Sequence, residues 1–231
     1  RNLRMAASLS EVLTVEEEKL KSKLDRWALE EEALRVRVRD GDSALVSEVR
    51  RSLEAADGRQ WLVGGLDVNA AGGVASMAVL EVPSLRCVEE VTAAVSLSEP
   101  YAAGFLGFRE APAYGALLER RRPDVAMVDG NGRLHPRGCG SACHVGVGNN
   151  LPAIGVAKEL HVVDGLTRHR IANDHCPRLR KKGDWLPLVG DSGTVWGAVL
   201  RTTGGGEGKE GEGEEGEGTE GEGTEGEGTE G

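Results

Sequence analysis

The sequence predicts an α/β fold, because two kinds of segment alternate along it. Short apolar runs at residues 61–69 and 125–128 end close to Asp and Gly residues, a pattern typical of buried strands. Residues 107–121 differ from these runs, because their apolar side chains recur at the spacing of a helix. This alternation favours a sheet with helices packed on it.

Residues 1–58 are predicted to form a helical extension. Apolar side chains recur there at roughly helical spacing between charged residues, at Leu20, Leu24, Trp27, Leu34 and Val38. The pattern indicates one amphipathic helix that breaks near residues 40–42, followed by a shorter helix at residues 44–53. We expect the long helix to pack against the rest of the protein. A partner-binding or coiled-coil role is the alternative, although the heptad period is not sustained.

The remaining elements follow in order along the chain. Three antiparallel strands in succession are expected at residues 61–69, 74–82 and 87–96, with turns at residues 72–73 and 83–84. Helices are expected at residues 107–121 and 138–147, and later strands at residues 125–128 and 153–156. A hairpin is expected at residues 186–200, turning at residues 191–194.

The charge of the chain is unevenly distributed. The 231 residues carry a formal net charge of −10, which is unusual for a protein that binds nucleic acid. Residues 204–231 hold eleven Glu and one Lys, so this tail accounts for all of that charge. The tail has no apolar residue and is predicted to be disordered. Basic runs at residues 120–122 and 178–182 either meet phosphate groups or form solvated surface.

Cysteine usage and the absence of visible targeting signals indicate the cellular compartment of the protein. Four cysteines occur without a Cys-X-X-Cys pair, at Cys87, Cys139, Cys143 and Cys176. No signal peptide and no run long enough to cross a membrane is visible. We therefore expect free thiols in a reducing compartment, cytoplasmic or nuclear. Because the chain begins at Arg1 rather than Met, we expect a fragment or a partial gene product.

Three acidic residues are candidate metal ligands. Asp129 follows the apolar run 125–128, so it lies at the carboxyl end of a predicted strand, where open α/β sheets place ligands. Asp67 lies inside the apolar strand 61–69, where a carboxylate is unfavourable unless it is paired or binds a cation. Glu110 opens a predicted helix. Such oxygen ligands suit Mg²⁺, whereas the alternative for Asp129 is an ordinary Asp-Gly turn.

Five segments, in this order, resemble the endonuclease V family. They are GGLDV (64–68), PYAAGFLGFRE (100–110), VDGNGRLHPRGCGSACHVGV (128–147), GVAK (155–158) and GDSGTVWGAVLR (190–201). Each segment is modest alone, but five in order are highly specific. The resemblance implies a ribonuclease H-like fold, a mixed sheet flanked by helices. It also implies Mg²⁺-dependent hydrolysis, with Mn²⁺ as a substitute, of a phosphodiester one nucleotide beyond inosine.

The resemblance also suggests how the chain is divided. It implies a helical extension at residues 1–58, a catalytic domain at residues 59–203 and the acidic tail at residues 204–231. The expected substrate is single-stranded RNA or DNA that contains inosine, in nucleic-acid repair or inosine-RNA processing. Family members continue past the hairpin with a further strand and helix that have no counterpart here, so we expect exposed apolar surface and reduced activity.

The family's site residues carry over to matching positions in this sequence. Asp67, Glu110 and Asp129 are implied to hold the metal, and Lys158 to steady the attacking water or the transition-state phosphate. Pro100 and Tyr101 are implied to form a wedge that stacks beside the lesion. The remaining implied contacts surround the flipped base, at Gly104, Leu106, Gly130, Gly138, Gly140, Ala142 and His144. Backbone groups facing O6 and N1–H of hypoxanthine would select inosine over adenosine.

Rival interpretations accompany several of these residues. Tyr101 is alternatively a core aromatic residue, and Lys158 an ordinary surface lysine. The cysteines and histidines at positions 135–144 fit no standard zinc spacing, and His135 is interpreted as structural. Residues 190–193 resemble the nucleophile loop of trypsin-like proteases, but Thr194 follows where that loop has Gly, and no matching His motif precedes it.

Three classes of function therefore remain. The first is the nuclease, and the second is an inosine-binding module that has lost activity. The third is a structural protein whose acids are merely solvated, which leaves Asp67 in its apolar strand unexplained. The sequence does not decide whether the substrate is RNA or DNA, since a contact with a 2′-hydroxyl has no sequence signature.

Overall fold

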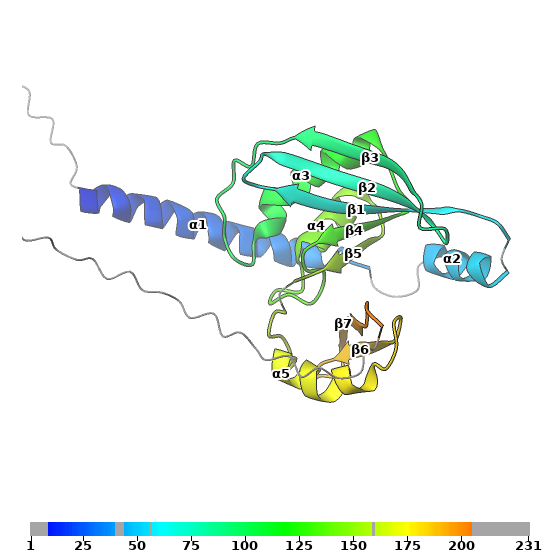
Figure 1. The fold of residues 1–231 in the computed structure, drawn as a ribbon. Helices are drawn as coiled ribbons and strands as arrows, with labels where there is room; N and C mark the ends of the chain where they lie inside the picture. The colour runs from blue at the N-terminus through cyan, green and yellow to red at the C-terminus, as the bar shows by residue number, and fades with distance from the viewer. Residues whose placement is uncertain (1–8, 40–43, 56, 159, 205–231) are drawn as a thin grey trace, which may run out of the picture.

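The computed structural model describes residues 9–39, 44–55, 57–158 and 160–204, and it confirms the predicted α/β class (Figure 1). Five strands form one mixed sheet in the order β3-β2-β1-β4-β5, and helices flank it. Within the described residues, we find no helix with the length and apolar character needed to span a lipid bilayer.

The sheet combines an antiparallel meander with two parallel strands. β1 (Trp61–Asn69) pairs with β2 (Val74–Val82), which pairs with β3 (Cys87–Ala94). β4 (Val125–Asp129) runs parallel to β1, and β5 (Ala153–Val156) runs parallel to β4. The five predicted strands are confirmed, although the third ends at Ala94 rather than at residue 96. Because β1, β4 and β5 are parallel, their carboxyl ends meet at one edge of the sheet.

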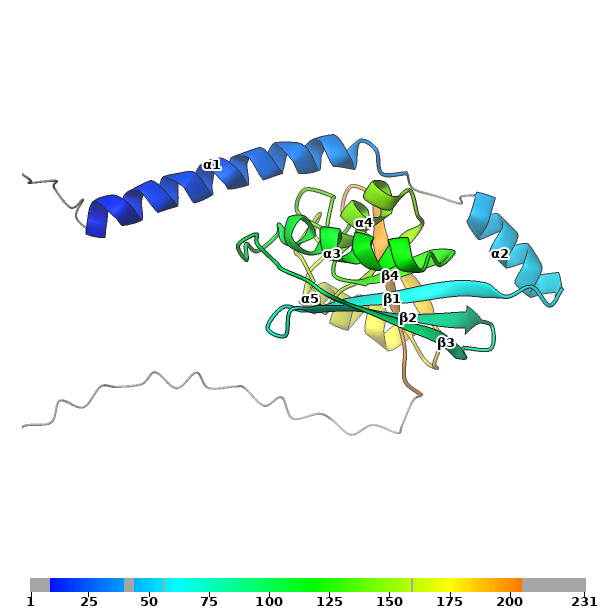
Figure 2. The same ribbon diagram turned by 90° about the horizontal axis from the view of Figure 1, so that it is seen from above.

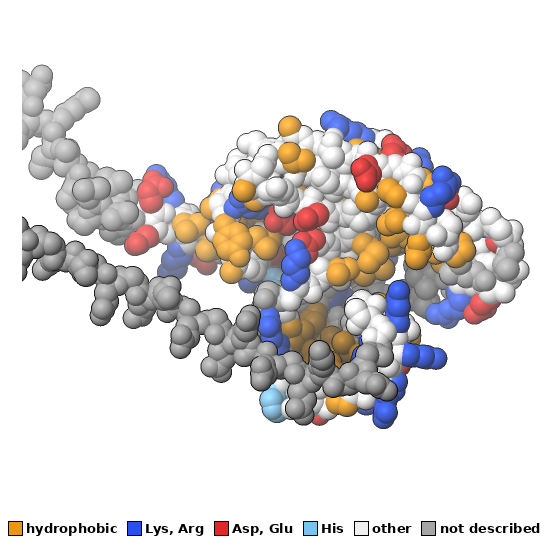
Figure 3. Space-filling view, in the orientation of Figure 1, with side chains coloured by type: hydrophobic (Ala, Val, Ile, Leu, Met, Phe, Trp, Pro, Cys, Tyr) orange, Lys and Arg blue, Asp and Glu red, His pale blue; other side chains and the backbone are white. Residues whose placement is uncertain are grey.

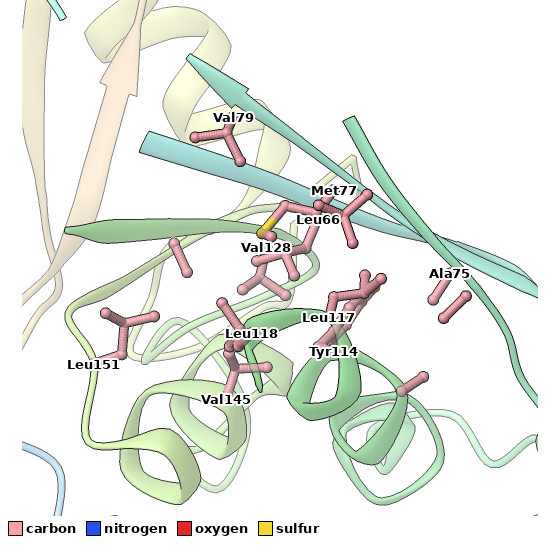
Figure 4. Packing of buried hydrophobic residues seen from close by; sticks show 14 of the residues in the cluster. Leu66, Ala75, Met77, Val79, Tyr114, Leu117, Leu118, Val128, Val145 and Leu151 are labelled. Atoms are coloured by element: carbon pink, nitrogen blue, oxygen red, sulfur yellow. The ribbon is translucent and has the colours of Figure 1, made fainter. Parts of the chain in front are cut away.

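Two helices cover one face of this sheet. They are α3 (Leu106–Arg120) and α4 (Ser141–Asn149). Figure 4 shows Tyr114 and Leu117 of α3 directed toward Leu66, Met77 and Val128 of the sheet, all of them fully or almost fully buried. The alternating apolar residues of the strands thus form the core with the apolar stripe of α3.

The helix α4 begins three residues later than the sequence predicted. Gly138 has a φ of +66°, and Gly140, which directly precedes the helix, is extended with φ −89° and ψ −173°. Because neither conformation belongs to a helix, residues 138–140 form a loop that leads into α4. Several of the predicted base-contacting residues therefore lie on this loop and not on the helix.

The N-terminal segment forms two helices, α1 (Leu9–Arg35) and α2 (Ala44–Ala55). Figure 2 shows α3 and α4 between α1 and the sheet, so the long helix packs on the fold as predicted, but on the helical layer and not directly on the sheet. Trp27 of α1 is buried and stacks on Phe108 of α3 with ring centroids 4.8 Å apart. The apolar stripe of α1 therefore packs on the helical layer. The predicted break near residues 40–42 lies outside the described residues.

The last described part of the chain builds a second, smaller sheet. The short helical turns α5 (Arg168–Arg170), η1 (Ile171–His175) and η2 (Cys176–Arg178) precede the antiparallel strands β6 (Trp185–Val189) and β7 (Val195–Leu200). The predicted hairpin is confirmed. Its turn is held by Asp164, whose carboxylate accepts hydrogen bonds from Ser192 and Trp196. The predicted disordered tail lies, apart from Gly204, outside the described residues.

Candidate active site

Two carboxylates lie side by side at the carboxyl ends of β1 and β4. The parallel register pairs Leu66 with Val128, so the following residues, Asp67 and Asp129, are neighbours across the two strands. Leu66 and Val128 point into the core. Since side chains alternate along a strand, both Asp side chains leave the core face of the sheet. In the orientation of Figure 1, acidic side chains gather beside a basic group on the visible surface (Figure 3).

Lys158 reaches the same place from the end of β5. Its Nζ donates a hydrogen bond to Oδ2 of Asp129 at 2.7 Å. The strand pairing that positions it continues past β4, because the backbone N–H of Gly130 donates to the carbonyl of Val156 at 3.0 Å. Asp129 raises the pKa of Lys158 through this hydrogen bond and through its charge, and Asp67 raises it further. Lys158 therefore contributes a positive charge to the pair of Asp side chains.

Glu110 joins the group from the N-terminal part of α3, just after its first turn. Burial raises the pKa of the Glu110 carboxyl; the charges of Asp129 and Asp67 raise it further, and Arg109 acts in the opposite direction. Burial also raises the pKa of Tyr114, one helical turn later, and the same three carboxylates contribute. Like charges that raise one another's pKa lie close together. We call Asp67, Glu110 and Asp129 the acidic cluster.

The acidic cluster fits a divalent cation in its donor chemistry. Hard cations such as Mg²⁺ take carboxylate oxygens, and a cation would offset the repulsion among these carboxylates. Within the described ranges, however, no three Asp, Glu, His or Cys side chains are already gathered as ligands of one ion. Binding of one ion by all three side chains would therefore require them to move closer together.

One argument made from the sequence is wrong. Asp67 was expected to be a buried charge that requires a partner, but its side chain is exposed. Its Oδ1 accepts a hydrogen bond from the backbone N–H of Val68, the next residue in the strand. The burial of a charge in an apolar strand therefore gives no reason for a cation here. Asp67 and Asp129 belong together because they end neighbouring parallel strands, and Glu110 joins them because both Asp charges raise its pKa.

Residues 130–140, which we call the recognition loop, lie tightly between β5 and α4. A Cβ atom at Gly140 would stand 2.3 Å from the carbonyl oxygen of Asn131, and one at Gly155 would stand 2.4 Å from the backbone nitrogen of Gly132. The N–H of Gly140 donates to the carbonyl of Gly132 at 2.8 Å. Only glycine allows this approach of backbone to backbone. Gly130 and Gly140 thus lie close to the start of α4 and its buried Ala142, whereas Gly138 lies against Arg35 of α1.

Residues 100–105, which we call the wedge loop, carry Pro100 and Tyr101 on the surface. Tyr101 is 70% exposed, so the alternative that it is a core residue is wrong. Gly104 joins this loop to the recognition loop, because its carbonyl accepts hydrogen bonds from Nε2 of His135 at 3.1 Å and from the guanidinium of Arg137. Leu106 begins α3 directly after the wedge loop.

The two histidines of this region are buried. Burial lowers the pKa of His135 to about 4, with Arg137 and His161 acting in the same direction. The predicted structural role of His135 agrees with its hydrogen bond to Gly104. His144 is packed edge-on against Phe108 and between α3 and α4. The nearby Cys139 and Cys143 are buried free thiols, as predicted.

Sequence reasoning missed two charged residues that the fold brings to this region. Glu31 of α1 is 1% exposed and forms an ion pair with Arg137 of the recognition loop. A signal was present, because Glu31 follows the predicted core residue Trp27 by four positions and so shares its face of the helix. A charged residue on an apolar stripe is normally buried only with a partner.

The fold and this cluster define an α/β protein of the ribonuclease H-like class, with carboxylates at the ends of its central parallel strands. The chain belongs to the endonuclease V family, whose sequence model matches residues 44–207. It is 42% identical over 191 residues to endonuclease V from Homo sapiens, covering 78% of this chain and 66% of that protein. The same identity and length are found with endonuclease V from Mus musculus, of which 55% is covered.

Solved structures agree with this assignment. The crystal structure of human ENDOV matches with a TM-score of 0.68 and 42% identity, covering 78% of each chain. Endonuclease V from Ciona intestinalis, solved in complex with a 23mer DNA containing an inosine followed by a ribo-adenosine, matches with a TM-score of 0.64 and 29% identity, over 78% of this chain and 77% of that one. The chain spans between 55% and 66% of the length of the mouse and human relatives.

Proposed function

We propose that this chain is a metal-dependent endonuclease that hydrolyses a phosphodiester bond near inosine in RNA or DNA. The observation that carries the proposal is the placement of Asp67 and Asp129 at the ends of neighbouring parallel strands, with Lys158 hydrogen-bonded to Asp129; both Asp charges also raise the pKa of Glu110. The Ciona intestinalis relative was crystallised on DNA that contains inosine, which supports nucleic acid as the substrate.

The acidic cluster would hold Mg²⁺, or Mn²⁺ in its place. When bound, such an ion would supply the positive charge that polarises a phosphate and lowers the pKa of a water molecule. The carboxylates would retain the ion through their negative charge, at the edge of the sheet where β1 and β4 end. Lys158 carries its charge on a side chain that is 81% exposed, so the ammonium is free to leave Asp129 for a phosphate oxygen.

The wedge and recognition loops would select the base. The exposed ring of Tyr101 is available to stack in the gap that an unstacked base leaves. The closely packed glycines of the recognition loop leave backbone groups able to approach a base edge. Hypoxanthine presents an acceptor at O6 and a donor at N1, and adenine presents the reverse pattern, so backbone donors and acceptors would discriminate between them.

Cleavage of matched strands tests the proposal. Single strands of RNA and of DNA that differ only in one inosine or adenosine are incubated with Mg²⁺, Mn²⁺ or EDTA. We expect cleavage of the inosine strands alone, and only with a divalent ion. Asp67→Asn and Asp129→Asn should abolish cleavage while the protein stays folded, and both should reduce the rise in melting temperature that Mg²⁺ produces.

A matched pair of substitutions on α3 separates a site effect from a change in overall charge. Glu110→Gln removes a charge from the acidic cluster, whereas Glu119→Gln removes an exposed charge from the other end of the same helix. Only Glu110→Gln should lower the cleavage rate and reduce the rise in melting temperature that Mg²⁺ produces. Parent-level cleavage by the Asp67, Asp129 and Glu110 variants would refute the assignment of the cluster. A chain that binds inosine strands without cutting them would instead be an inosine-binding module.

A further inference from the structure

The carboxylate of Glu31 is buried behind the wedge and recognition loops. Glu31 is 1% exposed and lies on α1, on the same helix face as Trp27 and Arg35, which precede and follow it by four residues. Trp27 packs on Phe105 and Phe108, and a Cβ atom at Gly138 would stand 3.0 Å from Cδ of Arg35. The helix face around Glu31 therefore contacts both loops and the start of α3.

Each oxygen of this carboxylate faces a different segment. Oε2 accepts a hydrogen bond from Nε of Arg137, in the recognition loop. Oε1 lies 3.5 Å from Nε2 of His144, on α4. That ring nitrogen is buried and has no hydrogen-bond partner among the described residues. Glu31 thus places one negative charge between the side chains of Arg137 and His144.

Arg137 carries the connection on to the wedge loop. Its guanidinium donates to the carbonyl of Gly104 and lies 3.8 Å from the centre of the Phe105 ring. The chain of contacts therefore runs from Glu31 through Arg137 to the loop that presents Tyr101. A guanidinium held on one side by a carboxylate has little freedom to rotate, so its contact with Gly104 is fixed in direction.

We propose that Glu31 is a positioning residue for base recognition, which holds the wedge loop and α4 at the separation that an inosine requires. This inference rests on the proposed function, and it gives α1 a role in specificity in addition to packing. Glu31 acts on the region of base recognition and not on the acidic cluster. The charge of Glu31 acts on the pKa values of His135, Cys139 and Cys143. The charges that act on the pKa of Glu110 are those of Arg109, Asp129 and Asp67.

Equilibrium binding of fluorescein-labelled strands in EDTA provides the test, because it does not depend on cleavage. The strands differ only in one inosine or adenosine, and the ratio of their dissociation constants measures discrimination. Glu31→Gln keeps the shape of the side chain but removes its charge. We expect it to reduce discrimination by between about 10-fold and about 100-fold, the range in which misplaced recognition groups act. Glu32→Gln, an exposed neighbour on the same helix, should leave the ratio unchanged.

Two further measurements distinguish positioning from a merely structural role. In cleavage assays, Glu31→Gln should lower kcat/KM for inosine strands while the Mg²⁺ concentration for half-maximal rate stays as in the parent. A 2-aminopurine base placed beside the inosine should show less fluorescence increase on binding, because the wedge no longer opens the stack. Glu31→Asp restores the charge on a shorter stem and should recover part of the discrimination. Circular dichroism shows whether each variant is folded.

The outcomes decide the inference and the proposed function separately. A parent-like ratio and parent-like 2-aminopurine signal in folded Glu31→Gln would overturn the inference and leave the proposed function intact. A parent that discriminates without cleaving would refute the nuclease, while the binding ratios of the Glu31 variants still decide the inference. A parent that binds inosine and adenosine strands equally would overturn both.

Discussion

The ammonium nitrogen of Lys158 lies 2.7 Å from Oδ2 of Asp129, which joins the end of β5 to the end of β4. The same carboxylate stands beside Asp67 across the parallel pair of strands. Lys158 therefore occupies the position of a counter-ion to the acidic cluster. This arrangement makes the lysine and a metal ion alternative sources of positive charge for Asp129.

Replacing Lys158 by Ala should change the response to Mg²⁺ in two ways. In EDTA the variant should melt at a lower temperature than the parent, because the repulsion within the acidic cluster is less well compensated. Added Mg²⁺ should then raise its melting temperature by more than it raises that of the parent. Cleavage should fall by about 100-fold or more, as when one stabilising donor is lost from a transition state. Lys21→Ala, at an exposed position on α1, is the control, and equal behaviour of the two variants would argue against this role of Lys158.

Replacing Tyr101 by Ala should weaken binding without affecting stability. The ring is 70% exposed, so its removal leaves no cavity in the core. Loss of one base–aromatic stack should weaken binding of inosine strands by about 1–3 kcal/mol. Leu85→Ala is a suitable control, because Leu85 is 69% exposed and lies in the turn between β2 and β3, at the opposite end of β1 from Asp67. A large drop in melting temperature with unchanged affinity would show that Tyr101 supports the fold instead.

Replacing each of two glycines of α3 by alanine should have opposite effects on the stability of the protein. A Cβ at Gly107 would stand 2.5 Å from the buried ring of His144, whereas one at Gly115 meets nothing closer than 3.6 Å. Gly107→Ala should therefore destabilise the protein by about 1–3 kcal/mol through overpacking, and it should impair inosine binding by displacing His144. Gly115→Ala should stabilise it by about 0.5–1 kcal/mol, since alanine favours the helix. Urea unfolding measures both, and a stabilising Gly107→Ala would show that α3 and α4 can separate.

His135 should remain neutral over the pH range in which free histidines titrate. Its Nε2 donates to Gly104 and its Nδ1 accepts from the backbone N–H of Arg137, which together require the neutral form protonated at Nε2. Burial lowers the pKa of His135 to about 4, although the charge of Glu31 acts in the opposite direction. In nitrogen-15 NMR, its ring should keep the Nε2–H pattern down to about pH 5. Titration near pH 6.5 would contradict this arrangement.

The same shift in the pKa of His135 has a consequence for stability. Because the pKa is lower in the folded protein than the ordinary value of about 6.5, the unfolded chain binds more protons between pH 6.5 and pH 4. The free energy of unfolding should therefore decrease progressively as pH falls through this window, and it should level off below about pH 4. His135→Gln, which cannot titrate, should have a flatter dependence on pH in the same window. Parallel curves for parent and variant would show that His135 does not contribute.

Local patterns were sufficient to predict most of the elements. The runs at residues 61–69, 74–82, 125–128 and 153–156 match β1, β2, β4 and β5 to within one residue, because an apolar run that ends at Gly, Asn, Asp or Pro has few alternatives to a strand. The start of α4 was misplaced, since the pattern of apolar residues does not reveal that Gly138 has a positive φ. The packing of α1 was predicted but the layer that it contacts was not, because an amphipathic stripe shows that a helix packs but not on which layer.

The sequence by itself determined the order of the strands along the chain, the hairpin at its end, and the motifs that relate it to endonuclease V. These are local properties, set by the spacing of apolar residues and by glycine and proline. The tertiary structure alone decided that Asp67 is exposed, that Lys158 meets Asp129, and that Glu31 meets Arg137 across 106 positions of the chain. Contacts between residues so far apart depend on how helices and strands stack, because burial and pairing are properties of the packed layers and not of any single segment.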